Sequence, residues 1–274
     1  MKAEQPNARC TGIRQVYKAA EPQKRESIRY TMALNKPFCR IYRPGLRRGA
    51  SNDHTRGFER DPLFLPDSER KSMIMAARLI IDDFEHLFEY VEPHTDNENV
   101  FSHRIYELLL RTCTEVESCC KGILIANGHA AKNMDDYKKI EQATHLSGYT
   151  VQYSNWLPTS YATQPFTKWA TNDSLPWYKA YNDVKHNRSQ NFKLASLKNL
   201  LDAISGLLCI IHAQVGDVVQ QVFESNIYFS SDEVDVTVRS FKINPYQFPD
   251  DEKYDFDWDN LKADPNRIQN FVFV

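Results

Sequence analysis

The feature that most constrains this fold is a repeat of apolar residues at alternating steps of four and three. The repeat consists of Met73, Ala77, Ile80, Phe84, Leu87 and Val91. This spacing places all six side chains on one face of an α-helix. Asp67 and Ser68 precede it, and either can cap a helix because its side-chain oxygen accepts from the free first-turn N–H groups. Pro93 cannot continue a helix, so a long amphipathic helix is predicted from residue 67 to before Pro93.

A second repeat of the same kind begins after Ser102 and ends before Asn127 and Gly128, a pair that favours a left-handed stop. Its members are Ile105, Leu108, Leu109, Val116, Cys119 or Cys120, and Ile123. The two helices would each have about 23–26 residues and a length of about 35–40 Å. Because the loop between them has about ten residues, we expect them to pack antiparallel.

The most apolar stretch predicts a central helix that starts near residue 194. It contains Leu194, Leu197, Leu200, Leu201, Ile204, Leu207, Leu208 and Ile211. A shorter helix is expected before it, with Ser174 as the cap, Pro176 in the first turn, and a course through Arg188. Together these patterns predict a mainly α chain, a helical bundle of four or five main helices over residues 67–225.

Weaker patterns predict short elements around the helices. Residues 135–144 can form a short helix, and residues 149–153 alternate as a strand or an extended loop does. Residues 226–244 alternate in part and favour a hairpin. The expected fold therefore ends in a small C-terminal β or extended tail.

The two ends of the chain differ in charge. Residues 1–66 carry 14 Lys and Arg against 6 Asp and Glu, which gives +8, and residues 231–274 carry 5 against 10, which gives −5. We expect residues 1–66 to be an extended basic arm and the acidic, aromatic residues 226–274 to wrap the helical body. The arm would contact nucleic acid or lie on an acidic tail, while a solvated arm paired within the chain explains the same charges.

Missing features exclude several classes of protein. No apolar run approaches the roughly 18 residues of a membrane helix, and the N-terminus has no apolar signal-peptide core, so the cytosol is the expected location. No CxxC pair is present, and we expect the helical cysteines to be core residues. These are Cys113, Cys119, Cys120 and Cys209. The motifs GxxxxGK[ST], GxGxxG, GxSxG and HExxH are absent, so no cofactor or metal is expected.

The densest group of chemically functional side chains lies in residues 179–188. In a helix, Asn182 and His186 are four residues apart and share a face, and Lys185 and Arg188 flank them. Histidine moves protons near neutral pH, and Lys and Arg can hold a phosphate oxygen and stabilise the charge that develops on it. Lys179, one turn earlier, adds a further cation for RNA. This pattern favours contact with a phosphodiester.

Asn182 and His186, with the order of the helices, resemble the HEPN (higher eukaryotes and prokaryotes nucleotide-binding) domain over roughly residues 68–222. HEPN ribonucleases carry Arg, usually Asn, three variable residues and His, and Tyr181 stands here at the Arg position. The resemblance implies a homodimer that cleaves RNA without metal, with a toxin or anti-phage role. It implies His186 as general acid or base, Asn182 as an orienting amide, and Lys185 and Arg188 as phosphate contacts.

Another interpretation explains the same residues. Trp177, Tyr181 and Val184 would form a core face, which leaves Lys185, His186 and Arg188 as a solvated basic edge. The chain would then be a non-catalytic helical interaction or scaffold protein that docks a protein partner. A glutamate of the second long helix, Glu115 or Glu117, would orient His186, pair with Arg188 across the bundle, or make local structural pairs.

Overall fold

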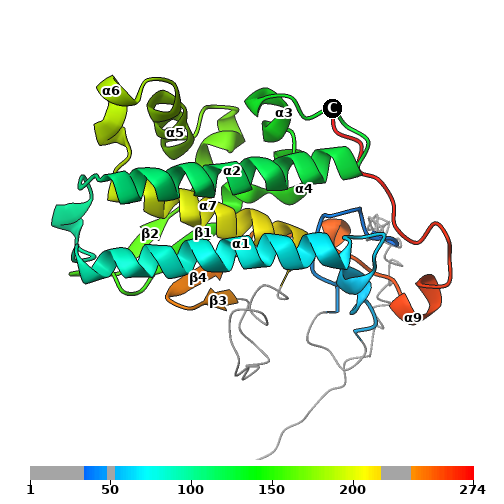
Figure 1. Cartoon of the computed structure of the whole chain (residues 1–274). Helices are drawn as coiled ribbons and strands as arrows, with labels where there is room; N and C mark the ends of the chain where they lie inside the picture. The colour runs from blue at the N-terminus through cyan, green and yellow to red at the C-terminus, as the bar shows by residue number, and fades with distance from the viewer. Residues whose placement is uncertain (1–33, 48–52, 217–235) are drawn as a thin grey trace, which may run out of the picture. The chain divides into compact units, whose positions relative to one another are not determined.

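The computed structural model describes residues 34–47, 53–216 and 236–274. All of them belong to one unit, Met32–Val274. The described part is mainly α, as predicted, with four larger helices and a small sheet (Figure 1). The boundary expected at residue 66 is not seen, because residues 34–47 and 53–66 lie in the same unit as the helices. The first 33 residues of the predicted arm lie outside the described residues.

Helices α1 (Asp67–His86) and α2 (His103–Ala126) lie side by side and antiparallel (Figure 1). The start of α2 is the predicted one, since the Ser102 side chain accepts from the backbone N–H of Ile105 at 3.2 Å. The start of α1 differs, because Pro66 holds the cap position and makes no side-chain cap. Asp67 instead pairs with Arg70 and Lys71 within the first turn.

Helix α7 (Leu197–Val215) is the central element, as its sequence predicts. Every residue of this helix is buried except Lys198 and Asn199. The Ser196 side chain caps the first turn by accepting from the N–H of Asn199 at 3.3 Å. The helix lies behind α1 and α2 in Figure 1 and packs against both.

The predicted motif helix is α5 (Pro176–His186), followed by the short α6 (Arg188–Asn191). Pro176 is the first helical residue as predicted, but the cap is Leu175 rather than Ser174. The predicted helix over 135–144 is split into two short helices, α3 (Met134–Lys138) and α4 (Glu141–Thr144).

A four-stranded antiparallel sheet joins two distant parts of the chain. Its order is β2 (Tyr161–Thr163), β1 (Thr150–Tyr153), β4 (Phe241–Asn244) and β3 (Val236–Val238). The buried residues of β1 pair with those of β4, Val151 with Ile243 and Tyr153 with Phe241. The predicted β tail is therefore part of one sheet with the middle of the chain, because both strands bury the same face. Residues 226–235 of the predicted hairpin lie outside the described ranges.

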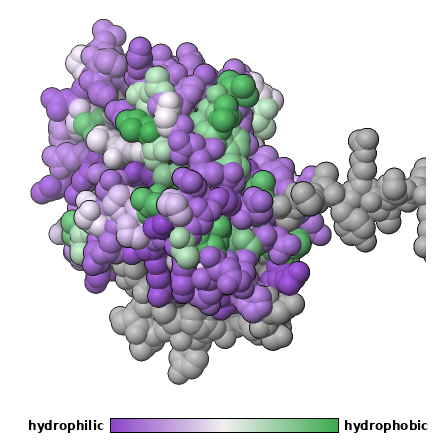
Figure 2. Space-filling model, turned by 90° about the vertical axis from the view of Figure 1, so that its right-hand side faces the viewer, coloured by the Kyte–Doolittle hydropathy of each residue, from purple (hydrophilic) through white to green (hydrophobic). Residues whose placement is uncertain are grey.

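Segment 34–47 and the residues after 248 meet at the C-terminal ends of α2 and α7. The Tyr254 hydroxyl is buried there, donates to the Ile41 carbonyl at 2.8 Å and accepts from the Phe38 N–H at 3.0 Å. The short α9 (Trp258–Leu261) follows. Figure 2 shows this end, where hydrophilic surface surrounds patches of apolar side chains. Three strongly exposed aliphatic residues of the segments that meet here are Ile125, Val272 and Val274.

The four helical cysteines are buried core residues, which confirms their prediction. Burial raises the pKa of each of these thiols, that of Cys119 to about 12. Among the helices that the structure describes, none combines the length and apolar character needed to cross a bilayer.

Candidate nucleic-acid interface

Helix α5 buries one face and exposes the predicted motif at its end. Trp177, Tyr181 and Val184 are almost fully buried, and Trp177 donates to the Pro165 carbonyl at 2.8 Å. This spacing of four and three residues anchors α5 on α7, where Gly206 leaves room for the Trp177 ring. The remaining face carries the charged residues of the motif.

Tyr181, the residue before Asn182, binds the nearby lysine. Lys185 Nζ donates to the Tyr181 hydroxyl at 2.8 Å and lies 4.9 Å from the centre of its ring. This hydrogen bond raises the pKa of Lys185, while burial raises the pKa of Tyr181. Lys185 therefore stays charged, exposed and fixed in position.

Asn182 and His186 share a face of α5, as their spacing predicts. The His186 side chain is exposed and that of Asn182 is half-buried. Neither side chain makes a hydrogen bond or ion pair with any residue in the described ranges. The predicted RNA contact Lys179 is occupied, since its Nζ pairs with Asp183 at 2.7 Å.

The helix ends at His186, so Arg188 does not continue the face predicted for it. Asn187 leaves helical geometry with φ −144° and ψ 72°, and the chain turns into α6. The Arg188 guanidinium carbon then lies 5.6 Å from the ring centre of Tyr106, on α2. The structure thus brings Arg188 to α2 instead of aligning it with Lys185.

Four rings from two segments meet beside Arg188. The ring centre of Phe192 lies 5.5 Å from that of Phe101, 4.8 Å from His103 and 6.0 Å from Tyr106. Phe101 is 40% exposed, His103 is exposed, and Tyr106 and Phe192 are half-buried. The sequence prediction missed this cluster. A signal was available, because Phe101 and Phe192 stand just outside helical repeats and have no place on a core face.

Backbone contacts hold these two segments together. The Leu197 N–H donates to the Val100 carbonyl at 2.8 Å, and the Lys198 N–H donates to the Glu98 carbonyl at 3.0 Å. Phe101 and Ser196 form an isolated antiparallel bridge. The N-terminal ends of α2 and α7 are therefore fixed side by side, at the end of the body that carries α6 (Figure 1).

One of the two segments that carry the rings is positively charged. Residues 185–193 contain Lys185, Arg188 and Lys193 and no acidic residue. Arg104 on α2 is 83% exposed and its nearby acid is Glu107, at 3.1 Å. We call Phe101, His103, Tyr106, Arg188, Phe192 and Lys193 the basic–aromatic surface.

Glu117, one of the two predicted glutamates of α2, has a structural role. Glu117 accepts from the Tyr178 hydroxyl at 2.8 Å and lies 3.8 Å from Lys121 Nζ. Glu117 therefore ties α2 to α5 and pairs with neither His186 nor Arg188. Within the described ranges, no three His, Cys, Asp or Glu side chains are grouped closely enough to hold a metal ion.

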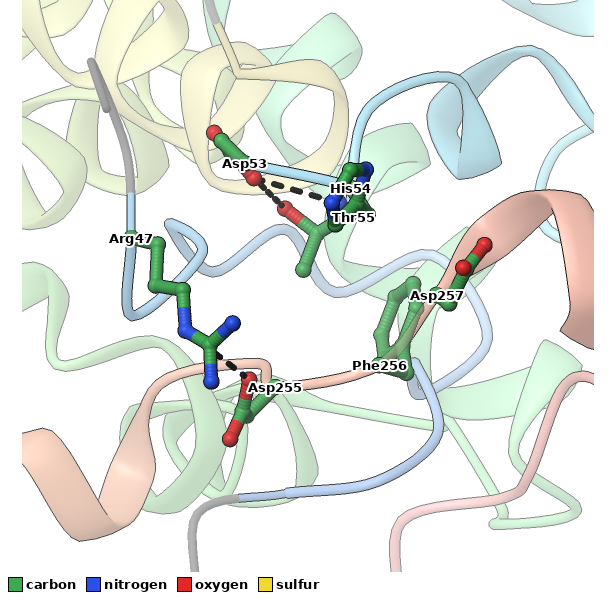
Figure 3. A pocket seen from close by; sticks show the side chains of 7 residues that line it. All are labelled: Arg47, Asp53, His54, Thr55, Asp255, Phe256 and Asp257. Carbon is green, nitrogen blue, oxygen red and sulfur yellow. Dashed lines mark hydrogen bonds and ion pairs between the residues drawn. The ribbon is translucent and has the colours of Figure 1, made fainter. Parts of the chain in front are cut away.

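Two hollows lie away from the motif. A hollow of about 190 Å³ lies between segment 53–55 and segment 255–257 (Figure 3). Its polar groups largely satisfy one another, since Asp53 accepts from the N–H and hydroxyl of Thr55 and Figure 3 shows Arg47 directed toward Asp255, 4.0 Å away. A larger cleft lies beside β2. Neither is lined by Asn182 or His186.

The arrangement defines a mainly helical protein with a basic, aromatic surface at one end. No family model, no curated protein and no solved structure matches the chain.

Proposed function

We propose that this chain is a HEPN-like protein that binds single-stranded RNA through its basic–aromatic surface. The observation that carries the proposal is the cluster of partly exposed rings, centred on Phe192, beside cations that have no acidic neighbour in residues 185–193. Proteins that bind single strands combine the same two features, because cations follow the phosphates and rings stack on unpaired bases.

Magnitudes favour a single strand as the ligand. Stacking of one base on an aromatic side chain contributes about 1–3 kcal/mol, and only unpaired bases offer a free face. Each phosphate that a cation neutralises adds about 0.7 to the slope of log affinity against log salt for a single strand. Arg188 and Lys193 would supply two such contacts, and Lys185, fixed by Tyr181, a third.

Cleavage is the stronger form of the proposal and needs more than one copy of the chain. His186 would act as general acid or base and Asn182 as an orienting amide, but Tyr181 removes the arginine of the HEPN motif. Lys185 and Arg188 are turned toward Tyr181 and Tyr106. A second copy, as in the implied homodimer, would bring a further His186 and Arg188 to the same phosphate. A toxin or anti-phage role would follow only from this cleaving form.

Binding is tested by fluorescence anisotropy with a labelled single-stranded RNA over a range of salt. The variant is Arg188→Gln with Lys193→Gln, and the matched control is Lys71→Gln with Lys262→Gln, two exposed lysines outside this surface. For the variant, we expect the slope of log affinity against log salt to decrease in magnitude by about 1.4, and for the control we expect the wild-type slope. Equal slopes for variant, control and wild type would refute the proposal.

Cleavage is tested by incubating the protein with transfer RNA and EDTA, in parallel with His186→Ala, while light scattering reports the oligomeric state. Metal-independent cleavage that the variant loses, together with a dimer, supports a ribonuclease. RNA binding without cleavage supports a binding protein. The absence of both favours the alternative, a non-catalytic interaction protein with a protein partner.

A further inference from the structure

The larger cleft lies beside β2 and has a volume of about 590 Å³, within the usual range for small-molecule sites. Its walls come from Thr150 of β1, from β2 and residues 164–168, from the first turn of α5, and from Lys198 and Asp202 of α7. It shares none of its lining residues with the basic–aromatic surface. Its occupant is therefore a separate question from RNA binding.

A closed network of three side chains lies in this cleft. Lys198 Nζ donates to the Tyr161 hydroxyl at 2.6 Å and to Asp202 Oδ2 at 3.0 Å, and the Tyr161 hydroxyl donates to Asp202 Oδ1 at 2.7 Å. The Asp202 side chain is only 12% exposed. Burial and the neighbouring Asp202 raise the pKa of Tyr161, so its hydroxyl remains protonated and continues to donate.

The network keeps hydrogen-bonding capacity for a ligand. An ammonium has three donors, and Lys198 uses two of them within the network. Each carboxylate oxygen has two lone pairs, and each oxygen of Asp202 accepts one hydrogen bond from network partners. One fixed donor and two fixed acceptor positions thus remain in a site whose side chains are already ordered.

The charge of the cleft is not balanced. Lys198 and Asp202 neutralise each other, but Lys168 also lines the cleft and is exposed. Its ammonium makes no hydrogen bond or ion pair with any residue in the described ranges. Thr163 and Thr167 add hydroxyl groups to the same walls. A ligand with an anionic group for Lys168 and a hydroxyl donor for Asp202 would complement these walls.

We propose that this cleft binds a phosphorylated sugar, with its phosphate on Lys168 and a sugar hydroxyl donating to Asp202. A sugar phosphate supplies both groups in one small molecule. Phosphate forms charge-assisted hydrogen bonds with ammonium groups, and a buried carboxylate accepts strongly from hydroxyl groups. The proposal does not depend on RNA binding.

Isothermal titration calorimetry on the full chain tests this site with ribose 5-phosphate, ribose and inorganic phosphate as three separate probes. We expect saturable binding of ribose 5-phosphate and binding at least tenfold weaker for the other two. Lys168→Gln should weaken the binding of ribose 5-phosphate at least tenfold. Lys132 is an exposed lysine that does not line the cleft, so Lys132→Gln should leave this affinity unchanged.

Asp202→Asn tests the hydroxyl contact. It should reduce the difference in affinity between ribose 5-phosphate and inorganic phosphate. Because this variant alters a buried network, its folding is checked by circular dichroism, and Lys168→Gln tests the site if it unfolds. The proposal is overturned if ribose 5-phosphate does not bind wild type in the millimolar range. It is equally overturned if inorganic phosphate binds as tightly, or if Lys168→Gln binds like wild type.

Discussion

Helices α2 and α7 run parallel, and an arginine lies against aromatic rings at each end of the pair. The arginine is buried at the C-terminal end, which we call the closed end, and exposed at the N-terminal end, which we call the open end. At the C-terminal end, the Arg43 side chain is 4% exposed and its guanidinium carbon lies 5.0 Å from the ring centre of Phe248 and 5.7 Å from that of Phe38. At the N-terminal end, Arg188 lies exposed on the ring of Tyr106. The residue types are similar, and their surroundings differ.

Acidic residues account for the difference. Arg43 donates to the carboxylate and carbonyl of Glu252, each at 3.0 Å, and His145 Nε2 lies 2.9 Å from the same carboxylate. A buried arginine needs such partners, since an unpaired charge away from water is costly. Residues 185–193 contain no acid, so their cations remain in solvent. The closed end is therefore held by the ion pair of the buried Arg43, while the cations of the other end are exposed to solvent.

The largest expected effect contrasts the two arginines. Arg43→Met should lower the free energy of unfolding by about 2–4 kcal/mol, because the carbonyls of Ala143 and Glu252 lose a buried donor. Arg188→Met should change it by less than about 0.5 kcal/mol, since its side chain is exposed. Urea unfolding of both variants measures the contrast. Similar losses would mean that the open end is also structural.

The next effect contrasts two phenylalanines. Phe192→Ala should weaken the binding of single-stranded RNA by about 1–3 kcal/mol, because the surface on which a base stacks is lost. Phe273, which is 7% exposed and packs on Phe271 at the closed end, should behave in the opposite way. Phe273→Ala should cost about 3–5 kcal/mol of stability and leave the RNA affinity of the folded fraction unchanged.

Anisotropy titrations and thermal unfolding on the same samples separate these two outcomes. If Phe273→Ala weakened RNA binding as much as Phe192→Ala does, the loss of affinity would reflect general destabilisation of the protein. The basic–aromatic surface would then carry no specific role.

Helical periodicity was sufficient to predict the larger elements, because the core face of each helix repeats within the sequence itself. The start of α2 follows from Ser102, whose side chain caps it. The central helix was predicted to start near residue 194, whereas α7 begins at Leu197, after the Ser196 cap. The start of α1 did not follow, because Asp67 pairs with nearby lysine and arginine instead of capping. The sheet was predicted only in pieces, since β1 and β4 are far apart in sequence and pair through a shared buried face.

The candidate site was predicted in part for a similar reason. Asn182 and His186 share a face because both lie within α5, and local spacing is enough to place them. Arg188 does not follow from spacing, because α5 ends at His186, two residues before it. The ring cluster around Phe192 depends on contacts between α2 and the segment before α7. Such contacts leave no periodic signal in the sequence.

The smallest expected effect concerns pH at the closed end. Glu141, the first residue of α4, accepts from the N–H of Ser147 at 3.0 Å and from its hydroxyl. Burial nevertheless raises the pKa of Glu141, against the hydrogen bonds from Ser147 that lower it. The folded state therefore holds this proton more tightly than the unfolded state. The resulting stabilisation is fully present below the unfolded pKa of about 4.3 and is lost as the pH rises through the folded pKa.

Glu141→Gln removes this proton from the folding equilibrium. Urea unfolding from pH 4 to pH 7 should show wild type losing stability relative to the variant as the pH rises. Arg188→Gln, at the open end, should follow the pH dependence of wild type, because it leaves Glu141 in place. A difference between wild type and Glu141→Gln that stays constant with pH would show that burial does not hold the proton on Glu141. The closed end would then owe its stability to packing and to the Arg43 hydrogen bonds alone.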